Sequence, residues 1–141
     1  MKYKLLVLDV DGTLLNDAKE ISKRTLASLL KVQQMGIRVA LASGRPTYGL
    51  MPLAKTLELG NYGGFIISYN GGQIINAQNG EILFERRINP EMLPYLEKKA
   101  RKNNFAIFTY HDDTILTDSS DNEHVLSLIH ISEPTRLRCI S

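Results

Sequence analysis

Three short apolar segments, each followed by small polar residues, restrict most strongly what this chain can fold into. They are residues 3–8 (YKLLVL), 37–42 (IRVALA) and 64–69 (GFIISY). Continuous apolar runs of this length are typical of strands in a parallel sheet, where helices bury both faces. The segments between them carry apolar residues at helical spacing. The sequence therefore predicts an α/β fold with a Rossmann-like parallel sheet flanked by helices.

Residues typical of helix ends flank the two segments between the predicted strands, as alternating strands and helices require. Ser22 suits the N-cap of the first helix, and Ile21 and Leu26 occupy the positions of a hydrophobic staple. Gly36 suits the end of that helix, and Pro46 suits the first turn of the second. The expected buried stripe of the first helix comprises Leu26, Leu29, Leu30 and Met35, and the second helix is expected to carry the apolar residues Leu50, Met51, Leu53, Ala54 and Leu57.

The pattern changes after residue 70. Asn79-Gly80 is a strong hairpin signal, and Asn89-Pro90 opens a further helix. The later elements are expected at residues 73–76, 81–87, 89–104, 105–110 and 114–117. We interpret residues 1–87 as one domain and residues 88–125 as the beginning of a second, truncated α/β domain.

The last segment, residues 126–141 (LSLIHISEPTRLRCIS), differs in kind from the rest. Its first eleven residues look like the in-frame translation of a transposase-type sequencing-library adapter, and the remainder fits a variable index followed by constant sequence. The alternative is a natural amphipathic segment, because four of its residues are apolar at suitable positions. We interpret residues 126–141 as a foreign, adapter-derived tail and exclude them from reasoning about the fold.

Composition excludes several classes of protein. With 43% hydrophobic and 23% charged residues, the chain is typical of a soluble globular protein. Its net charge of +2 comes from dispersed residues, so we expect no nucleic acid and no membrane as partner. We find no signal peptide, no transmembrane segment and no second cysteine beside Cys139, and therefore expect a cytoplasmic protein without disulfides. No obligate protein partner is evident.

Polar residues follow the first two predicted strands and define one candidate site. Asp9 and Asp11 follow the first strand, and Ser43 and Gly44 follow the second. Ligands of open parallel sheets bind beyond the carboxyl ends of the strands, so we expect both pairs to meet there. Gly12 lets the chain turn away at once, which leaves backbone N–H groups free to face an anion.

Paired carboxylates suit a reaction that needs a nucleophile and a proton donor. They also repel a phosphate substrate, and a divalent cation would resolve that conflict. Ser43 and Gly44 offer a hydroxyl and a backbone N–H to phosphoryl oxygens, close to the N-terminus of a helix. A surface turn is the alternative interpretation of Asp-x-Asp-Gly-Thr, because Asp and Gly are common in turns.

These motifs resemble those of a known family. DVDGTLL at residues 9–15 resembles the first motif of the haloacid dehalogenase-like phosphatases, and LASGRP at residues 41–46 resembles the second. SYNGGQI at residues 68–74, with the hairpin after it, is similar to the Cof-type branch. The resemblance covers residues 4–125 and implies the N-terminal half of a haloacid dehalogenase-like core, followed by the start of an α/β cap domain near residue 88.

The resemblance also implies roles for individual residues. Asp9 would be the nucleophile that forms an aspartyl-phosphate, and its carboxylate would bind Mg²⁺. Asp11 would protonate the leaving group, activate the hydrolytic water and lend its carbonyl to the metal. Val10 and Gly44, through backbone N–H groups, and Ser43, through its hydroxyl, would bind the phosphoryl group.

Three further positions have open interpretations. Arg45 could contact substrate or anchor the following helix, and Asn70 could contact substrate or form an Asx-turn. For His111 with Asp112-Asp113 we favour a hairpin turn over a metal site, because no matching ligand spacing accompanies them.

In the second half of their chains, members of the family also have a lysine that helps to hold the phosphoryl group and a metal-binding Gly-Asp-x-x-Asn-Asp cluster. Residues 1–125 contain neither of these two elements. We therefore expect the parent protein to be a Mg²⁺-dependent hydrolase of small phosphorylated metabolites, either sugar phosphates or phosphorylated cofactors. This chain would be a truncated, inactive fragment with residues 3–8 at an unprotected apolar sheet edge. The alternative is a short, non-catalytic module for phosphate or metal binding or for interaction.

Overall fold

A computed structural model describes residues 3–111, 114–117 and 136–139. The chain divides into two compact units, Met1–Arg86 and Arg87–Ser141. The residues of the candidate site, from Asp9 to Asn70, all lie in the first unit.

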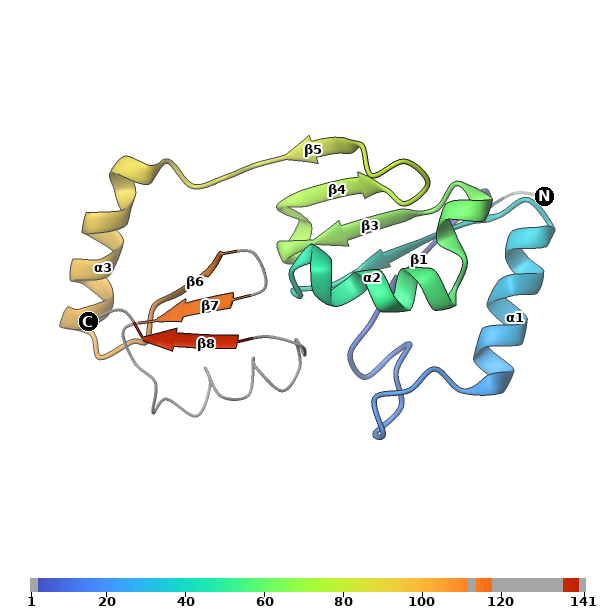
Figure 1. The fold of residues 1–141 in the computed structure, drawn as a ribbon, viewed down its shortest axis with the longest axis horizontal. Coiled ribbons are helices and arrows are strands. Elements are labelled where there is room, and N and C mark those ends of the chain that lie inside the picture. The colour runs from blue at the N-terminus through green and yellow to red at the C-terminus, as the bar shows by residue number, and fades with distance from the viewer. Residues whose placement is uncertain (1–2, 112–113, 118–135, 140–141) are drawn as a thin grey trace. The chain divides into compact units, whose positions relative to one another are not determined.

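The first unit contains a five-stranded sheet in the order β1-β2-β3-β4-β5 (Figure 1). Its parallel part, as predicted, comprises β1 (Leu5–Asp9), β2 (Arg38–Ala42) and β3 (Phe65–Ser68). The hairpin of β4 (Gln73–Asn76) and β5 (Ile82–Glu85) adds to the same sheet in antiparallel orientation. The sheet is therefore mixed, and the predicted hairpin around Asn79-Gly80 is confirmed.

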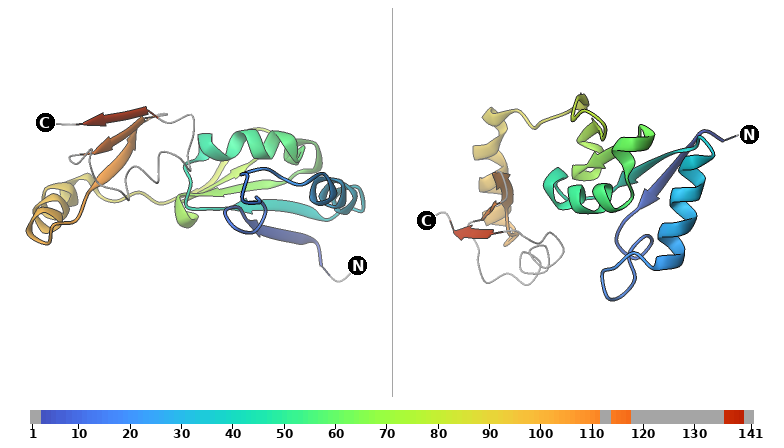
Figure 2. Two further views of the ribbon diagram at one scale, coloured as in Figure 1. Left: turned by 90° about the horizontal axis from the view of Figure 1, so that it is seen from below. Right: turned by 45° about the vertical axis from the view of Figure 1, so that its right-hand side comes forward.

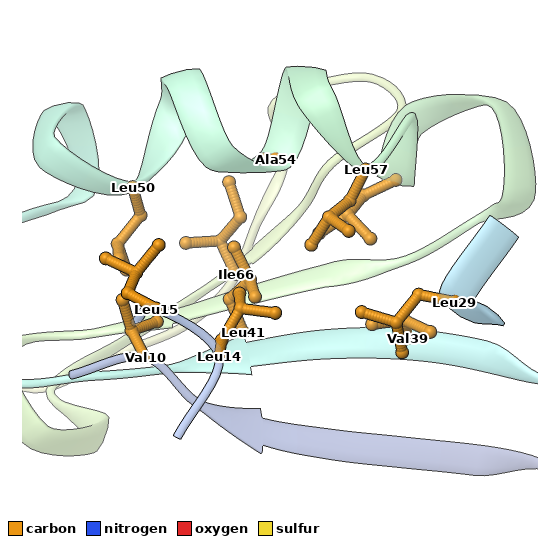
Figure 3. Packing of buried hydrophobic residues seen from close by; sticks show 11 residues of the cluster. Val10, Leu14, Leu15, Leu29, Val39, Leu41, Leu50, Ala54, Leu57 and Ile66 are labelled. Atoms are coloured by element: carbon orange, nitrogen blue, oxygen red, sulfur yellow. The ribbon is translucent and has the colours of Figure 1, made fainter. Parts of the chain in front are cut away.

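Two helices connect the parallel strands and supply the core. These are α1 (Lys23–Gln34), capped by Ser22, whose Oγ accepts a hydrogen bond from the Thr25 N–H at 3.1 Å, and α2 (Thr47–Thr56), which begins after Pro46. A short 3₁₀ helix, η1 (Leu59–Tyr62), follows α2. Figure 3 shows helix and strand side chains packed together in this core, among them Leu29, Leu50, Ala54, Leu57, Val39, Leu41 and Ile66.

One of the expected core positions, Met35, is wrong, and one apolar residue of the second helix, Met51, lies outside the core. Met35 is 53% exposed because it lies at the C-cap of α1, past the last full turn, and Met51 is 52% exposed on the outer side of α2. Gln33 is buried instead, at 2% exposure, and its Nε2 donates to the Leu57 carbonyl at 2.8 Å. A polar side chain thus joins α1 to the end of α2 at a position where an apolar stripe alone would not predict it.

The expectation that helices bury both faces of β1 is also wrong for this unit. Both α1 and α2 lie on the same face of the sheet (Figure 2). Leu6 and Leu8 point to that face and pack against the core, whereas Leu5 and Val7 point away and remain 48% and 49% exposed. Since β1 pairs with β2 alone among the described strands, it is an edge strand with an apolar, uncovered face.

The second unit contains the helix and the two strands expected after residue 88, and also a third strand within residues 126–141, where none was expected. A 3₁₀ turn, η3 (Pro90–Met92), leads into α3 (Leu93–Lys102). The antiparallel pair β6 (Phe108–His111) and β7 (Thr114–Thr117) follows, and β8 (Arg136–Cys139) pairs with β7 in parallel. Asp112-Asp113, in the expected turn, lie outside the described residues. Of the helices in the described ranges, none is long and apolar enough to cross a membrane.

Replacing Val7 by Lys tests the consequence of the open sheet face. Exposed apolar sheet surface beside an unpaired edge promotes association. We therefore expect the 141-residue chain to self-associate and the Val7→Lys variant to be more monomeric. Size-exclusion chromatography with light scattering measures the difference.

Met51→Lys is the matched control, because Met51 is similarly exposed but lies on α2 rather than on the sheet. An equal gain of monomer in both variants would mean that added charge, and not the sheet face, controls association.

Candidate active site

The carboxyl ends of β1, β2 and β3 form one edge of the parallel part of the sheet. Asp9 pairs with Ala42, and Ala42 pairs with Ile67, so the three strands end in register. A cleft of about 360 Å³ opens there, lined by Asp9, Ala42, Ser43, Gly44, Ile67, Asn70 and Gly71. The structure thus brings four of the residues singled out from the sequence, Asp9, Ser43, Gly44 and Asn70, to one cavity.

The chain leaves β1 through a tight turn. Val10 is fully buried, and its carbonyl accepts hydrogen bonds from the N–H groups of Leu14 and Leu15 at 3.1 and 3.0 Å. Gly12 has a φ of +78°, a left-handed conformation that favours glycine. The turn keeps Asp9 exposed at the end of the strand while Val10 anchors the loop in the core.

Asp11 lies beside the cleft rather than among its lining residues. The Nε and Nη2 of Arg45 donate to its two carboxylate oxygens at 2.9 and 2.7 Å, and Lys19 Nζ lies 3.5 Å from Oδ1. The sequence suggested that Arg45 contacts substrate or anchors the following helix, and neither interpretation included a contact with Asp11. No sequence spacing relates position 11 to position 45; the parallel pairing of β1 with β2 brings them together.

The surroundings of Asp11 alter its acidity. Partial burial raises the pKa of the Asp11 carboxyl, whereas the hydrogen bonds and charge of Arg45, with a smaller contribution from Lys19, lower it. The net effect holds the pKa of Asp11 below its ordinary value. In this arrangement the Asp11 carboxylate is therefore ionised at neutral pH.

The loop after β2 is held by the turn after β3. The Asn70 N–H donates to the Ser43 carbonyl at 3.1 Å, and the Tyr69 N–H donates to the Arg45 carbonyl at 3.0 Å. Tyr69, Asn70 and Gly71 all have left-handed backbone conformations, with φ values of 52°, 54° and 88°. Such conformations are strained for residues other than glycine and are found at functional sites. We call this pair of segments, residues 43–45 and 69–71, the clasp.

A close contact inside the clasp explains the glycine at position 44. A Cβ atom on Gly44 would lie 3.0 Å from Oδ1 and 3.3 Å from Nδ2 of Asn70. Across the described part of the chain, no hydrogen bond involves the Asn70 side-chain amide, so the Asx-turn interpretation is wrong. The amide lies against Gly44 at the cleft, where it can contact a ligand.

A polar network behind the clasp was not foreseen from the sequence. Thr47 Oγ1 lies 2.7 Å from the hydroxyl of the buried Ser68 and donates to Gln73 Oε1 at 2.7 Å. Gln73 Nε2 then donates to Glu85 Oε1 at 2.7 Å. The network joins the start of α2 to β3, β4 and β5. Polar residues inside predicted strands were the only signal for it.

The donor set suits a hard cation that keeps much of its water. In the described ranges, no group of three or more His, Cys, Asp or Glu side chains converges to hold a metal. Because Arg45 engages the Asp11 carboxylate, the chain offers the Asp9 carboxylate and backbone carbonyls. Mg²⁺ is commonly bound through one or two carboxylates, with water and substrate phosphate as the other ligands. These residues therefore fit Mg²⁺ as part of its ligand shell.

Known proteins share this fold. A family model for haloacid dehalogenase-like hydrolases matches residues 6–136. A haloacid dehalogenase-like hydrolase from Bacteroides thetaiotaomicron has a crystal structure that is 45% identical, with a TM-score of 0.86 over 99% of this chain and 52% of that one. The family match enters residues 126–141, whose assignment as a foreign tail stays a prediction.

Sequence relatives are longer than this chain. A Streptococcus pyogenes protein is 26% identical over 97% of this chain and 60% of its own length. The HMP-PP phosphatase of Yersinia pestis is 26% identical over 89% of this chain and 44% of its own length. The chain thus spans about half the length of the curated relatives that it matches.

Gly44→Ala tests the close contact in the clasp. The added methyl group would displace the Asn70 amide, and we expect a loss of about 1 kcal/mol in the free energy of unfolding. In an Asn70→Gly background, which keeps the left-handed backbone without the amide, the same substitution should have little effect. Urea denaturation of the four proteins in this double-mutant cycle measures the coupling.

Gly49→Ala is the matched control, because a Cβ there would meet its neighbours only at an ordinary 3.9 Å. Equal losses from Gly44→Ala with and without the Asn70 amide would contradict the contact.

Proposed function

Because this chain belongs to the haloacid dehalogenase-like hydrolase family, we propose that it carries the nucleophile-bearing part of a Mg²⁺-dependent site that hydrolyses small phosphomonoesters. The observation that carries the proposal is the cleft at the ends of the parallel strands, where Asp9, Ser43 and Gly44 meet. The proposal concerns the protein at the length of its relatives. We expect the 141-residue chain alone to lack turnover.

Asp9 is the nucleophile. Its carboxylate is exposed at the cleft, where one oxygen can attack the phosphorus of a bound phosphomonoester. The bond between phosphorus and the leaving oxygen breaks, and an aspartyl-phosphate forms. Attack by water on that phosphorus then releases inorganic phosphate and restores the carboxylate.

Asp11 is the general acid and the general base. It gives a proton to the departing alkoxide in the first step and takes one from the attacking water in the second. The negative charge of an arriving phosphate favours the protonated form of a nearby carboxyl, so Asp11, which is ionised without that charge, takes up a proton from solvent before it donates one. The position of Asp11 beside the cleft, two residues after Asp9, supports this assignment.

The phosphoryl oxygens are bound by the loop residues. The Ser43 hydroxyl accepts from the Arg45 N–H at 3.2 Å, so its own hydrogen stays available for a phosphoryl oxygen. Backbone N–H groups of Val10 and Gly44 add two donors, and the Asn70 amide lies close enough to Gly44 to add another. Donors held in place before the reaction stabilise the charge that develops on the phosphoryl group.

Mg²⁺ would be held by the Asp9 carboxylate and the Asp11 backbone carbonyl. When bound, it supplies positive charge that offsets the repulsion between these carboxylates and the substrate.

We infer the substrate class from the relatives. The relative named HMP-PP phosphatase supports a small phosphorylated metabolite, either a sugar phosphate or a phosphorylated cofactor.

Asp9→Asn should lower turnover by roughly 10³-fold or more, because the amide oxygen is a poor nucleophile. Phosphate release from sugar phosphates, with Mg²⁺ and with excess chelator, measures this in the full-length protein. Asp17→Asn, an exposed aspartate outside the cleft, should keep normal rates. Normal turnover by Asp9→Asn, or full activity in chelator, would refute the proposal.

Asp11→Asn should slow alkyl phosphates by about 10²-fold or more, because their leaving groups need a proton. p-Nitrophenyl phosphate, whose leaving group departs without one, should be slowed much less in its first step. Single-turnover kinetics with both substrates make the comparison. Equal slowing would assign Asp11 a role other than proton transfer.

A further inference from the structure

The Arg45 side chain leaves the loop that lines the cleft and turns to Asp11. Its Nε donates to Oδ2 at 2.9 Å and its Nη2 donates to Oδ1 at 2.7 Å. Two parallel hydrogen bonds from a planar guanidinium determine both the position and the plane of a carboxylate. The contact therefore orients Asp11 as well as balancing its charge.

The base of the Arg45 side chain is anchored as firmly as its end. The Arg45 N–H donates to Ser43 Oγ at 3.2 Å, and the Arg45 carbonyl accepts from the Tyr69 N–H at 3.0 Å. Arg45 thus belongs to the clasp, and the loop that presents Ser43 and Gly44 to the cleft also determines where Asp11 is held.

The placement of the guanidinium argues against direct contact with substrate. The Arg45 side chain is only 10% exposed, and Arg45 is not among the residues that line the cleft. Two of its donors, including Nε, are already engaged with Asp11. A phosphate in the cleft would therefore meet Ser43 and Gly44 before it met this guanidinium.

We propose that Arg45 is a positioning residue for Asp11, which orients the carboxyl that transfers the proton of the leaving group, and is not a ligand of the substrate phosphate. This inference rests on the proposed function. It assigns to Arg45 an effect on one chemical step rather than on substrate affinity.

Lys19 supplies a matched comparison. Its Nζ lies 3.5 Å from the same carboxylate, but its side chain is 55% exposed and makes one long contact. Exposed ion pairs of this kind contribute little. Lys19→Met should therefore leave the kinetics within about twofold of those of the wild type.

Arg45→Met in the full-length protein is the main test, read by single-turnover kinetics. We expect alkyl phosphates to be slowed about tenfold or more and p-nitrophenyl phosphate by less than about threefold, because only the former need the proton. The apparent affinity for both substrates should stay within about twofold. Arg45→Lys, which keeps the charge without the two-pronged geometry, should recover only part of the loss. In an Asp11→Asn background, Arg45→Met should add little.

A different pattern would overturn the inference. Weaker affinity for both substrates, with the same loss in the Asp11→Asn background, would make Arg45 a phosphate ligand. Full recovery of the alkyl phosphate rate by Arg45→Lys would show that positive charge alone supports proton transfer by Asp11, without the two-pronged contact.

A second readout does not depend on activity. In urea denaturation, the midpoint shifts of Arg45→Met and Asp11→Ala should overlap, so that the double variant loses much less than their sum. Additive shifts would mean that the pair is not formed, which overturns the inference. Normal turnover by Asp9→Asn would instead refute the proposed function, a separate result.

Discussion

The parallel pairing of β1, β2 and β3 determines where every candidate functional side chain lies. The pairs Asp9 with Ala42 and Ala42 with Ile67 align the carboxyl ends of the strands. A shift by one residue would move Val39, Leu41 and Ile66 from the helix-covered face to the open one. Burial of these side chains therefore specifies the register, and the register places the cleft. Core and site depend on the same constraint.

Charge at the cleft is arranged around two carboxylates with different surroundings. Asp11 is neutralised by Arg45 and lies beside the cleft, whereas Asp9 lines it. An approaching phosphate thus meets the charge of Asp9 most directly, and a cation bound there would offset that repulsion. The ion pair would let two carboxylates lie two residues apart near the proposed phosphate site without both repelling the phosphate.

Local patterns in the sequence were sufficient for most elements of the first unit. Ser22, Pro46 and Asn79-Gly80 act through their own backbone neighbours, so the ends of α1 and α2 and the hairpin could be predicted. The contact between Arg45 and Asp11, by contrast, depends on tertiary structure. The exposure of Val7 also depends on tertiary structure, because an apolar strand sequence does not reveal whether helices cover one face of the strand or both. The motifs could suggest that Asp9 and Ser43 belong to a functional site, but they could not predict the contacts that position these residues.

The clasp shows what holds the loop that carries Ser43 and Gly44. Left-handed conformations at Tyr69 and Asn70 are unfavourable by about 1–3 kcal/mol each, and less for Asn, so the surrounding structure must offset them. The N–H groups of these two residues donate to carbonyls of the loop, and the hydroxyl network of Thr47 and Ser68 secures the start of α2 next to it. The strain is therefore located where it places an amide against Gly44. A relaxed turn would leave both segments free to separate, and the donors along the cleft would then have to be ordered each time a ligand bound.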